Sequence, residues 1–384
     1  MTKNKQIVIA IFAILTLSVS LICCEFNATN VQNSAKSIIK NAILCNTFEK
    51  LPEKSPQNIN VMPDADGEDD TRKTEPYEGE SNSPEKQIES RTASKNVLTG
   101  EVLIEATTGR VLYGANETER LYPASTTKIL TALCVLNNLP IDEVATVPKE
   151  AVGVEGSSLY LKAGQKITVE DLLYGLMLRS GNDCAVALAM KTSGSIQKFA
   201  DLMNKTAFEC GALDSNFVNP HGLQDENHYT TPLDLAKITA KAYKNRDFLR
   251  IVSSKMRKIE IDDEEIVIAN KNKMLKLYAG ANGVKTGFTK SSGRCLVSGA
   301  RRGDMQLISV VLNCGDMWNE SVRLLNLGFD NYFMCPLDNA LLTGGNSEVR
   351  VVAKGGVDAS WHSIKYPLRK DGTERLVVTY TALP

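Results

Sequence analysis

The sequence has few histidines and almost no net charge, and each shortage excludes a class of function. It contains 3 histidines in 384 residues, and its formal net charge is -1 at pH 7. This charge balance gives no reason to propose nucleic acid or an anionic surface as a partner. The chain also lacks a Gly-x-Gly-x-x-Gly string and a phosphate-binding loop, so no cofactor is expected.

Neither the histidines nor the cysteines form a recognisable metal site or disulfide framework. His221 and His228 lie in one predicted loop, and a metal site there would need a third ligand, so structural hydrogen bonding is favoured and no metal is predicted. The 9 cysteines include no Cys-x-x-Cys pair, and most lie in apolar runs, as Cys134 does. Small buried hydrophobic residues are favoured over disulfides. Cys184 has no base beside it in the sequence, which argues against a catalytic thiol.

The first 96 residues differ in composition from the rest of the chain. Residues 1–24 begin with Lys3 and Lys5 and continue without charge to Cys24, which is typical of a signal peptide or an uncleaved signal anchor. They predict an extracytoplasmic protein of the cell envelope, either secreted or attached to the membrane through its N-terminus. Residues 25–96 are interpreted as a disordered tether with a possible short helix, because the stretch 51–94 has hardly any apolar residues.

Strand-like segments lie at both ends of the region 97–335, and helical patterns fill its middle. The strands are expected at 97–105, 110–113, 283–289, 294–300 and 305–312. The helices are expected at 125–136, 169–178, 183–191, 196–208, 232–244 and 319–327. This order predicts an α+β domain in which one antiparallel sheet, built from both chain ends, packs against a helical region. Residues 336–384 are predicted to form a small C-terminal β module with strands at 349–352 and 376–380.

Three short strings, in a fixed order, carry the chemistry. They are Ser125-Thr126-Thr127-Lys128, Ser180-Gly181-Asn182 and Lys285-Thr286-Gly287. Each alone has an ordinary explanation, such as a helix cap, a helix stop or an exposed strand lysine. Together they supply a nucleophile, a base, a proton relay and an anion-binding edge, which is the equipment of acyl transfer by a serine without a histidine.

Ser125 and Lys128 are the expected nucleophile and general base. Pro123 and Ala124 favour a helix start at this point, with the serine hydroxyl near the positive end of the helix dipole. Lys128 lies one helical turn further on the same face, so its amine can reach that hydroxyl. The lysine can accept the proton only if burial or positive neighbours lower its pKa.

The other two strings complete the predicted site. Ser180 is expected to relay the proton, and Asn182 to hold the lysine with its carbonyl and a substrate amide with its nitrogen. Lys285 and Thr286 are expected to bind a terminal carboxylate, and Gly287 to let substrate approach the strand edge. The backbone N–H groups of Ser125 and Phe288 are the expected oxyanion hole.

With these residues in view, the chain resembles the serine D-Ala-D-Ala carboxypeptidases, the low-molecular-mass penicillin-binding proteins. The resemblance covers about residues 97–335 and rests on the strings at 123–128, 178–183, 219–223, 228–231 and 284–287. It implies a β-lactamase/transpeptidase-like fold and an enzyme that cleaves the terminal D-alanine from peptidoglycan stem peptides through an acyl-serine. It also implies that β-lactam antibiotics acylate the serine, because they imitate that dipeptide.

Two departures and two alternatives accompany the resemblance. Relatives often carry an arginine just before the last helix, where this chain has Asp316 to Asn319, and often end in an amphipathic membrane helix, whereas this chain ends at Pro384.

A class A-like β-lactamase would need a Glu-x-x-x-Asn string between Asn182 and Lys285, and none is present. A catalytically idle peptidoglycan-binding protein is the other alternative, and the intact set of catalytic side chains argues against it.

Overall fold

The computed structural model describes residues 98–336, 347–354 and 365–381. The predicted signal segment and tether, residues 1–96, lie outside these ranges. Among the described residues, no helix combines the length and the apolar character that crossing a lipid bilayer requires. No disulfide bond joins the cysteines of the described part, and most of them are buried, as their apolar neighbours indicated.

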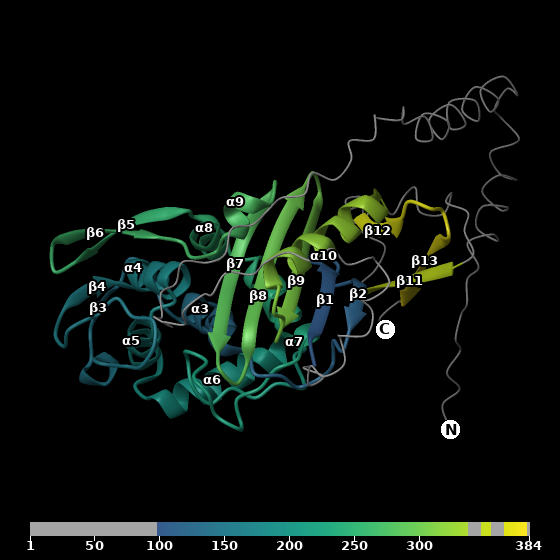
Figure 1. Ribbon diagram of the computed structural model, residues 1–384. Helices are drawn as coiled ribbons and strands as arrows, with labels where there is room; N and C mark the ends of the chain where they lie inside the picture. The colour runs from purple at the N-terminus through teal and green to yellow at the C-terminus, as the bar shows by residue number, and fades with distance from the viewer. Residues whose placement is uncertain (1–97, 337–346, 355–364, 382–384) are drawn as a thin grey trace, which may run out of the picture. The chain divides into compact units, whose positions relative to one another are not determined.

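A five-stranded antiparallel sheet forms the centre of the domain (Figure 1), with strand order β2-β1-β9-β8-β7. Its strands are β1 (Gly100–Glu105), β2 (Val111–Ala115), β7 (Ala281–Thr289), β8 (Gly293–Arg302) and β9 (Met305–Leu312). The start of the chain's fold joins its end where β1 pairs with β9, with Leu103 opposite Ser309. The predicted sheet from both chain ends is therefore confirmed, and β7 is one of its edges.

Helices cover both faces of this sheet (Figure 1). The helices of the described part are α3 (Lys128–Asn138), α4 (Val169–Tyr174), α5 (Asn182–Ser193), α6 (Ile196–Glu209), α7 (Pro232–Ala242), α8 (Arg246–Ser253), α9 (Met274–Leu277) and α10 (Met317–Asn331). Of these, α3, α7, α8, α9 and α10 pack against the sheet itself. Successive residues of a strand point to opposite faces. Accordingly, Val102 and Ile104 belong to the core formed with the helical region, whereas Leu103 belongs to the core beneath α10.

Several short elements in the middle of the chain are not predicted by the sequence patterns. They are β3 (Val144–Thr146), η4 (Lys149–Ala151), β4 (Lys166–Thr168), α8, α9, and the hairpin of β5 (Met256–Ile261) and β6 (Glu264–Ala269). The hairpin turns at Asp262 and Asp263, whose φ angles are 49° and 66°. Two-residue hairpins need positive φ at the turn, and aspartate tolerates this conformation without the usual glycine signal.

Two small pairs of strands make up the C-terminal part. β10 (Tyr332–Pro336) pairs antiparallel with β12 (Lys365–Arg369), and β11 (Ser347–Lys354) pairs parallel with β13 (Glu374–Thr381). The expected strands at 349–352 and 376–380 fall within β11 and β13, and the expected boundary at residue 336 falls within β10. Arg110 ties this part to the main sheet, since it donates to the Pro367 carbonyl and pairs with Glu374.

Gly299 leaves room for the Tyr243 side chain against the sheet. A Cβ at Gly299 would lie 1.9 Å from the Tyr243 hydroxyl oxygen, which donates to Asn282 Oδ1 at 3.0 Å. We expect Gly299→Ala to lower the free energy of unfolding, measured with urea, by about 1–3 kcal/mol, because the buried neighbours must move. Gly315→Ala is the control, since no heavy atom lies within 4 Å of its added Cβ. Equal stability of the two variants would contradict this packing.

Candidate active site

Ser125 lies in a tight turn between a proline and a helix. The 3₁₀ turn η3 (Ala124–Thr127) follows Pro123 and leads directly into α3. Ala124 has a left-handed backbone conformation, with φ of 48°, and is 1% exposed. A residue with a Cβ takes this conformation only where the surroundings hold it. Packing around Ala124 therefore fixes the half-buried Ser125 at the start of the helix.

Lys128 Nζ joins the first two strings to the loop that holds His221. The buried Nζ lies 2.8 Å from Ser125 Oγ, 2.7 Å from Asn182 Oδ1 and 2.7 Å from the His221 carbonyl oxygen. The Asn182 and His221 oxygens only accept hydrogen bonds, so they occupy both N–H groups of a neutral amine. The lone pair of that amine is then directed to Ser125. The arrangement suits Lys128 to take the serine proton.

The electrostatic surroundings of Lys128 favour its neutral form. Burial lowers the pKa of Lys128 well below its ordinary value, and the positive charge of Lys285 lowers it further. Both effects penalise the ammonium relative to the amine. The structure thus shifts the pKa of Lys128 in the direction that a lysine base requires, toward a lower proton affinity.

The second string follows a π-helical turn, η5 (Gly175–Arg179). Ser180 ends that turn in a left-handed conformation, with φ of 65°, and its residue is 6% exposed. No residue in the described ranges hydrogen-bonds the Ser180 hydroxyl. The amide nitrogen of Asn182, expected to contact a substrate amide, donates one of its two hydrogens to the Glu155 carbonyl. Asn182 is therefore held on one side by Lys128 and on the other by the protein backbone.

Asp183 holds the loop that positions Asn182. Its carboxylate accepts hydrogen bonds from the backbone N–H groups of Leu159 and Leu161 and from the Ser158 hydroxyl. The sequence alone does not predict a role for the buried Asp183. The next residue, Cys184, is also buried, and burial raises the pKa of its thiol well above the ordinary value. The thiol therefore stays protonated and chemically inert.

The third string lies on β7, at the edge of the sheet next to the serine. Residues of η3 lie close to Gly287: a Cβ built on this glycine would lie 3.0 Å from Ser125 N and 3.1 Å from Ala124 Cβ. The glycine allows η3 itself to approach the strand. Phe288, the next residue, has a side chain that is largely exposed. The two expected oxyanion donors therefore lie on facing segments.

Lys285 is buried behind this strand edge. Its Nζ donates to the Thr286 carbonyl at 2.9 Å. Burial, and then the charge of Lys271, lower the pKa of Lys285 to about 7. Lys271 is a functional candidate that the sequence does not reveal, since nothing distinguishes it within the chain's 44 lysines and arginines. It is exposed, and its Nζ reaches Ser157 Oγ at 3.3 Å, in the loop beside Asn182.

The two loop histidines form hydrogen bonds within the protein, each accepting from a backbone N–H at Nδ1. Nδ1 of His228 accepts from the Val218 backbone N–H, so Nε2 carries the proton and donates to Thr127 Oγ1 at 2.8 Å. Burial lowers the pKa of His228 to about 4 and that of His221 to about 3. Both rings therefore stay neutral. The contribution of His221 that the sequence missed is its backbone carbonyl, which accepts from Lys128.

Comparisons with known sequences place this chain in one family. The profile of the D-alanyl-D-alanine carboxypeptidase family matches residues 86–315. D-alanyl-D-alanine carboxypeptidase DacF of Bacillus subtilis is 35% identical over 223 residues, which cover 56% of this chain and 57% of that protein. DacC of Escherichia coli is 35% identical over 222 residues, covering 54% of each chain. The chain thus spans little more than half the length of these relatives.

Solved structures give the same result for the fold. A Streptomyces DD-transpeptidase is 33% identical, with a TM-score of 0.58, and the match covers 62% of this chain and 99% of that one. The D-alanyl-D-alanine carboxypeptidase DacD of Francisella tularensis is 28% identical, with a TM-score of 0.58 and coverage of 62% and 71%. These likenesses confirm the predicted α+β fold of the transpeptidase type.

The lowered pKa of Lys285 predicts a dependence of stability on pH. Its folded pKa is about 7, whereas the unfolded lysine keeps its proton to about 10.4, so unfolding between these values takes up a proton. Stability from this group therefore rises with pH. We expect the wild type to gain about 1 kcal/mol relative to Lys285→Met between pH 7 and 8.

Urea unfolding of both proteins at the two pH values measures this difference. Lys276→Met, at an exposed lysine of α9, is the matched control and keeps the wild-type dependence. An identical pH dependence for Lys285→Met and the wild type would show that the folded protein does not lower the pKa of Lys285.

Proposed function

Because the chain belongs to the D-alanyl-D-alanine carboxypeptidase family, we propose that it removes the terminal D-alanine from peptidoglycan stem peptides through an acyl-serine intermediate. The observation that carries the proposal is the contact between Ser125 Oγ and a buried Lys128 Nζ whose other partners are both acceptors. No cofactor is needed for this reaction, since the serine, the lysine and water supply every bond and proton.

In the acylation step, Ser125 Oγ attacks the carbonyl carbon of the penultimate D-alanine while Lys128 Nζ takes the hydroxyl proton. The negative charge on the carbonyl oxygen is stabilised by the backbone N–H groups of Ser125 and Phe288. The C–N bond to the terminal D-alanine then breaks. Ser180, whose hydroxyl both donates and accepts, passes the proton from Lys128 to the leaving amine.

Deacylation reverses these roles with water as the nucleophile. Lys128 takes a proton from the attacking water, and the ester bond to Ser125 Oγ breaks. The proton returns to Ser125, so the enzyme is regenerated and the shortened peptide leaves as a carboxylate. A β-lactam enters the first half of this cycle because its strained amide imitates the D-Ala-D-Ala bond, and we propose that it acylates Ser125.

The terminal carboxylate of the substrate is proposed to bind at the cationic side of the site. Lys285 and the Thr286 hydroxyl lie on β7, and exposed Lys271 lies near enough to lower the pKa of Lys285. Lys271 supplies a positive charge at a site where the arginine expected near Asp316 is absent. The substrate lies outside the cytoplasmic membrane, so an extracytoplasmic location is part of the proposal, as is attachment through residues 1–24.

Release of D-alanine from diacetyl-Lys-D-Ala-D-Ala tests the function. We expect Ser125→Ala to lower the rate of release by about 10³-fold or more, because no other nucleophile stands at the reacting carbon. The wild type should also retain labelled penicillin as a slowly lost acyl-enzyme. Rapid turnover of penicillin would support a β-lactamase instead, and no release of D-alanine by the wild type would support an idle binding protein.

The charge of Lys271 should act on substrate binding. We expect Lys271→Gln to raise KM for the tripeptide by about two- to fivefold, the size of a partly exposed charge pair, with little change in kcat. Lys276→Gln, at an exposed lysine of α9, is the matched control. A substrate whose terminal carboxylate is amidated should lose the effect, and an equal rise in KM for both substrates would contradict a carboxylate contact.

A further inference from the structure

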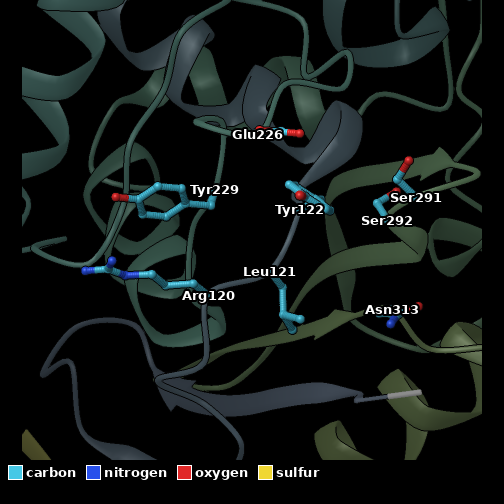
Figure 2. A pocket seen from close by; sticks show the side chains of 8 residues that line it. All are labelled: Arg120, Leu121, Tyr122, Glu226, Tyr229, Ser291, Ser292 and Asn313. Atoms are coloured by element: carbon cyan, nitrogen blue, oxygen red, sulfur yellow. The ribbon is translucent and has the colours of Figure 1, made fainter. Parts of the chain in front are cut away.

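A cavity of about 340 Å³ opens beside the catalytic turn and contains none of the residues assigned to the reaction. Figure 2 shows Tyr122 between Tyr229 on one side and Ser291 and Ser292 on the other. Glu226 lies across from Leu121 in this view. Such a volume is in the range of small-ligand sites, which span about 300–1,000 Å³.

The cavity is lined by residues that lie close to the reacting serine along the chain. Tyr122 precedes Pro123 and the η3 turn, and its backbone carbonyl accepts from Cys295 Sγ at 3.7 Å. Cys295 pairs with Gly287 across β7 and β8. Ser291 and Ser292 follow the end of β7. The cavity thus lies between the residues that precede the catalytic turn and those that follow the end of β7.

The direction of the bound peptide leads into this cavity, an argument that rests on the proposed function. The terminal carboxylate lies at Lys285 and Thr286, and the reacting carbonyl lies at Phe288. The rest of the peptide must continue in the same direction, past Thr289. Each residue of an extended chain advances about 3.3 Å, so the residue before the two D-alanines stands at the edge of the cavity.

The walls of the cavity favour a positively charged side chain. Arg120 extends away from Tyr122 in Figure 2. Its guanidinium pairs with Asp214 at 3.2 Å and lies over the Tyr229 ring, 4.9 Å from the ring centroid. Glu226 is exposed, and no residue in the described ranges forms an ion pair or a hydrogen bond with its carboxylate. Arg120, the cationic residue of the cavity wall, is thus already paired, whereas the Glu226 carboxylate has no such partner within the described ranges.

The turn at the end of β7 gives the cavity a rigid wall. Ser292 is buried, and its hydroxyl oxygen accepts from the Thr289 backbone N–H at 2.9 Å. The Thr289 hydroxyl oxygen accepts from the Ser292 backbone N–H at 3.0 Å. These reciprocal bonds fix the turn, whereas Ser291 beside it is exposed. The space is thereby shaped before any ligand arrives.

We propose that this cavity binds the third residue of the stem peptide, and that Glu226 selects a side chain ending in an ammonium group, such as that of lysine or another diamino acid. The ammonium would pair with the Glu226 carboxylate while the aliphatic stem of the side chain lies along Tyr122. The cavity is a specificity site for the residue before the D-alanines and takes no part in bond breaking.

The test compares two substrates that differ only in the charge at this position. Acetyl-Lys-D-Ala-D-Ala with a free side-chain ammonium and its diacetylated form are cleaved by the wild type, Glu226→Gln and Glu264→Gln. We expect the wild type to favour the charged substrate by about two- to fivefold in kcat/KM, and the preference to shrink at high salt. Glu226→Gln should remove the preference, while Glu264→Gln, an exposed glutamate of the β5–β6 hairpin, should keep it.

A second variant tests the cavity without changing charge. Ser291→Trp fills the space, so kcat/KM should fall more for the lysine-containing peptide than for acetyl-D-Ala-D-Ala, which has no third residue. Equal cleavage of the charged and neutral substrates by the wild type overturns the subsite but leaves the proposed function standing. A preference that survives in Glu226→Gln also overturns it. No cleavage of any substrate overturns the function and the subsite together.

Discussion

The site depends on one buried nitrogen, Lys128 Nζ, and on the contacts that replace the water it has lost. An unpaired lysine in the core is strongly unfavourable, so its surroundings must provide acceptors and must favour the neutral amine. The Asn182 oxygen comes from the loop after η5, the His221 carbonyl from the loop before α7, and Ser125 from η3. Three segments far apart in the sequence are therefore fixed relative to one another by the need to satisfy a single atom.

Two glycines allow the backbone to come close enough for this arrangement. Gly287 brings β7 against η3, and Gly222, with φ of 86°, brings its loop over Ala124. A Cβ on Gly222 would lie 1.8 Å from the Ala124 carbonyl oxygen. The loop could not then place the His221 carbonyl at Lys128. The position of Lys128 thus depends on having glycine at 222 and 287 as well as on the side chains that contact its amine.

The sequence predicts the sheet, its main helices and the meeting of the three strings, because periodic patterns and fixed local spacing carry that information. It does not predict the β5–β6 hairpin, whose aspartate turn lacks a glycine, or the role of Gly287, which depends on what packs against it. Lys271 and the His221 carbonyl escape for another reason. The His221 carbonyl contacts Lys128, and Lys271 lies close enough to Lys285 to lower its pKa. These distances arise only in the folded chain and cannot be predicted from the residue types.

In the proposed reaction, the three lysines of the site link substrate binding to catalysis. Lys285 lowers the pKa of Lys128, and Lys271 lowers that of Lys285, so in the empty site each positive charge opposes the next. A substrate carboxylate bound among them has the opposite sign and raises the proton affinity of all three. Before the substrate arrives, burial and the neighbouring positive charges hold the pKa of Lys128 below its ordinary value, and the bound carboxylate raises it. In the proposed reaction, the base gains its strength when the carbonyl reaches Ser125.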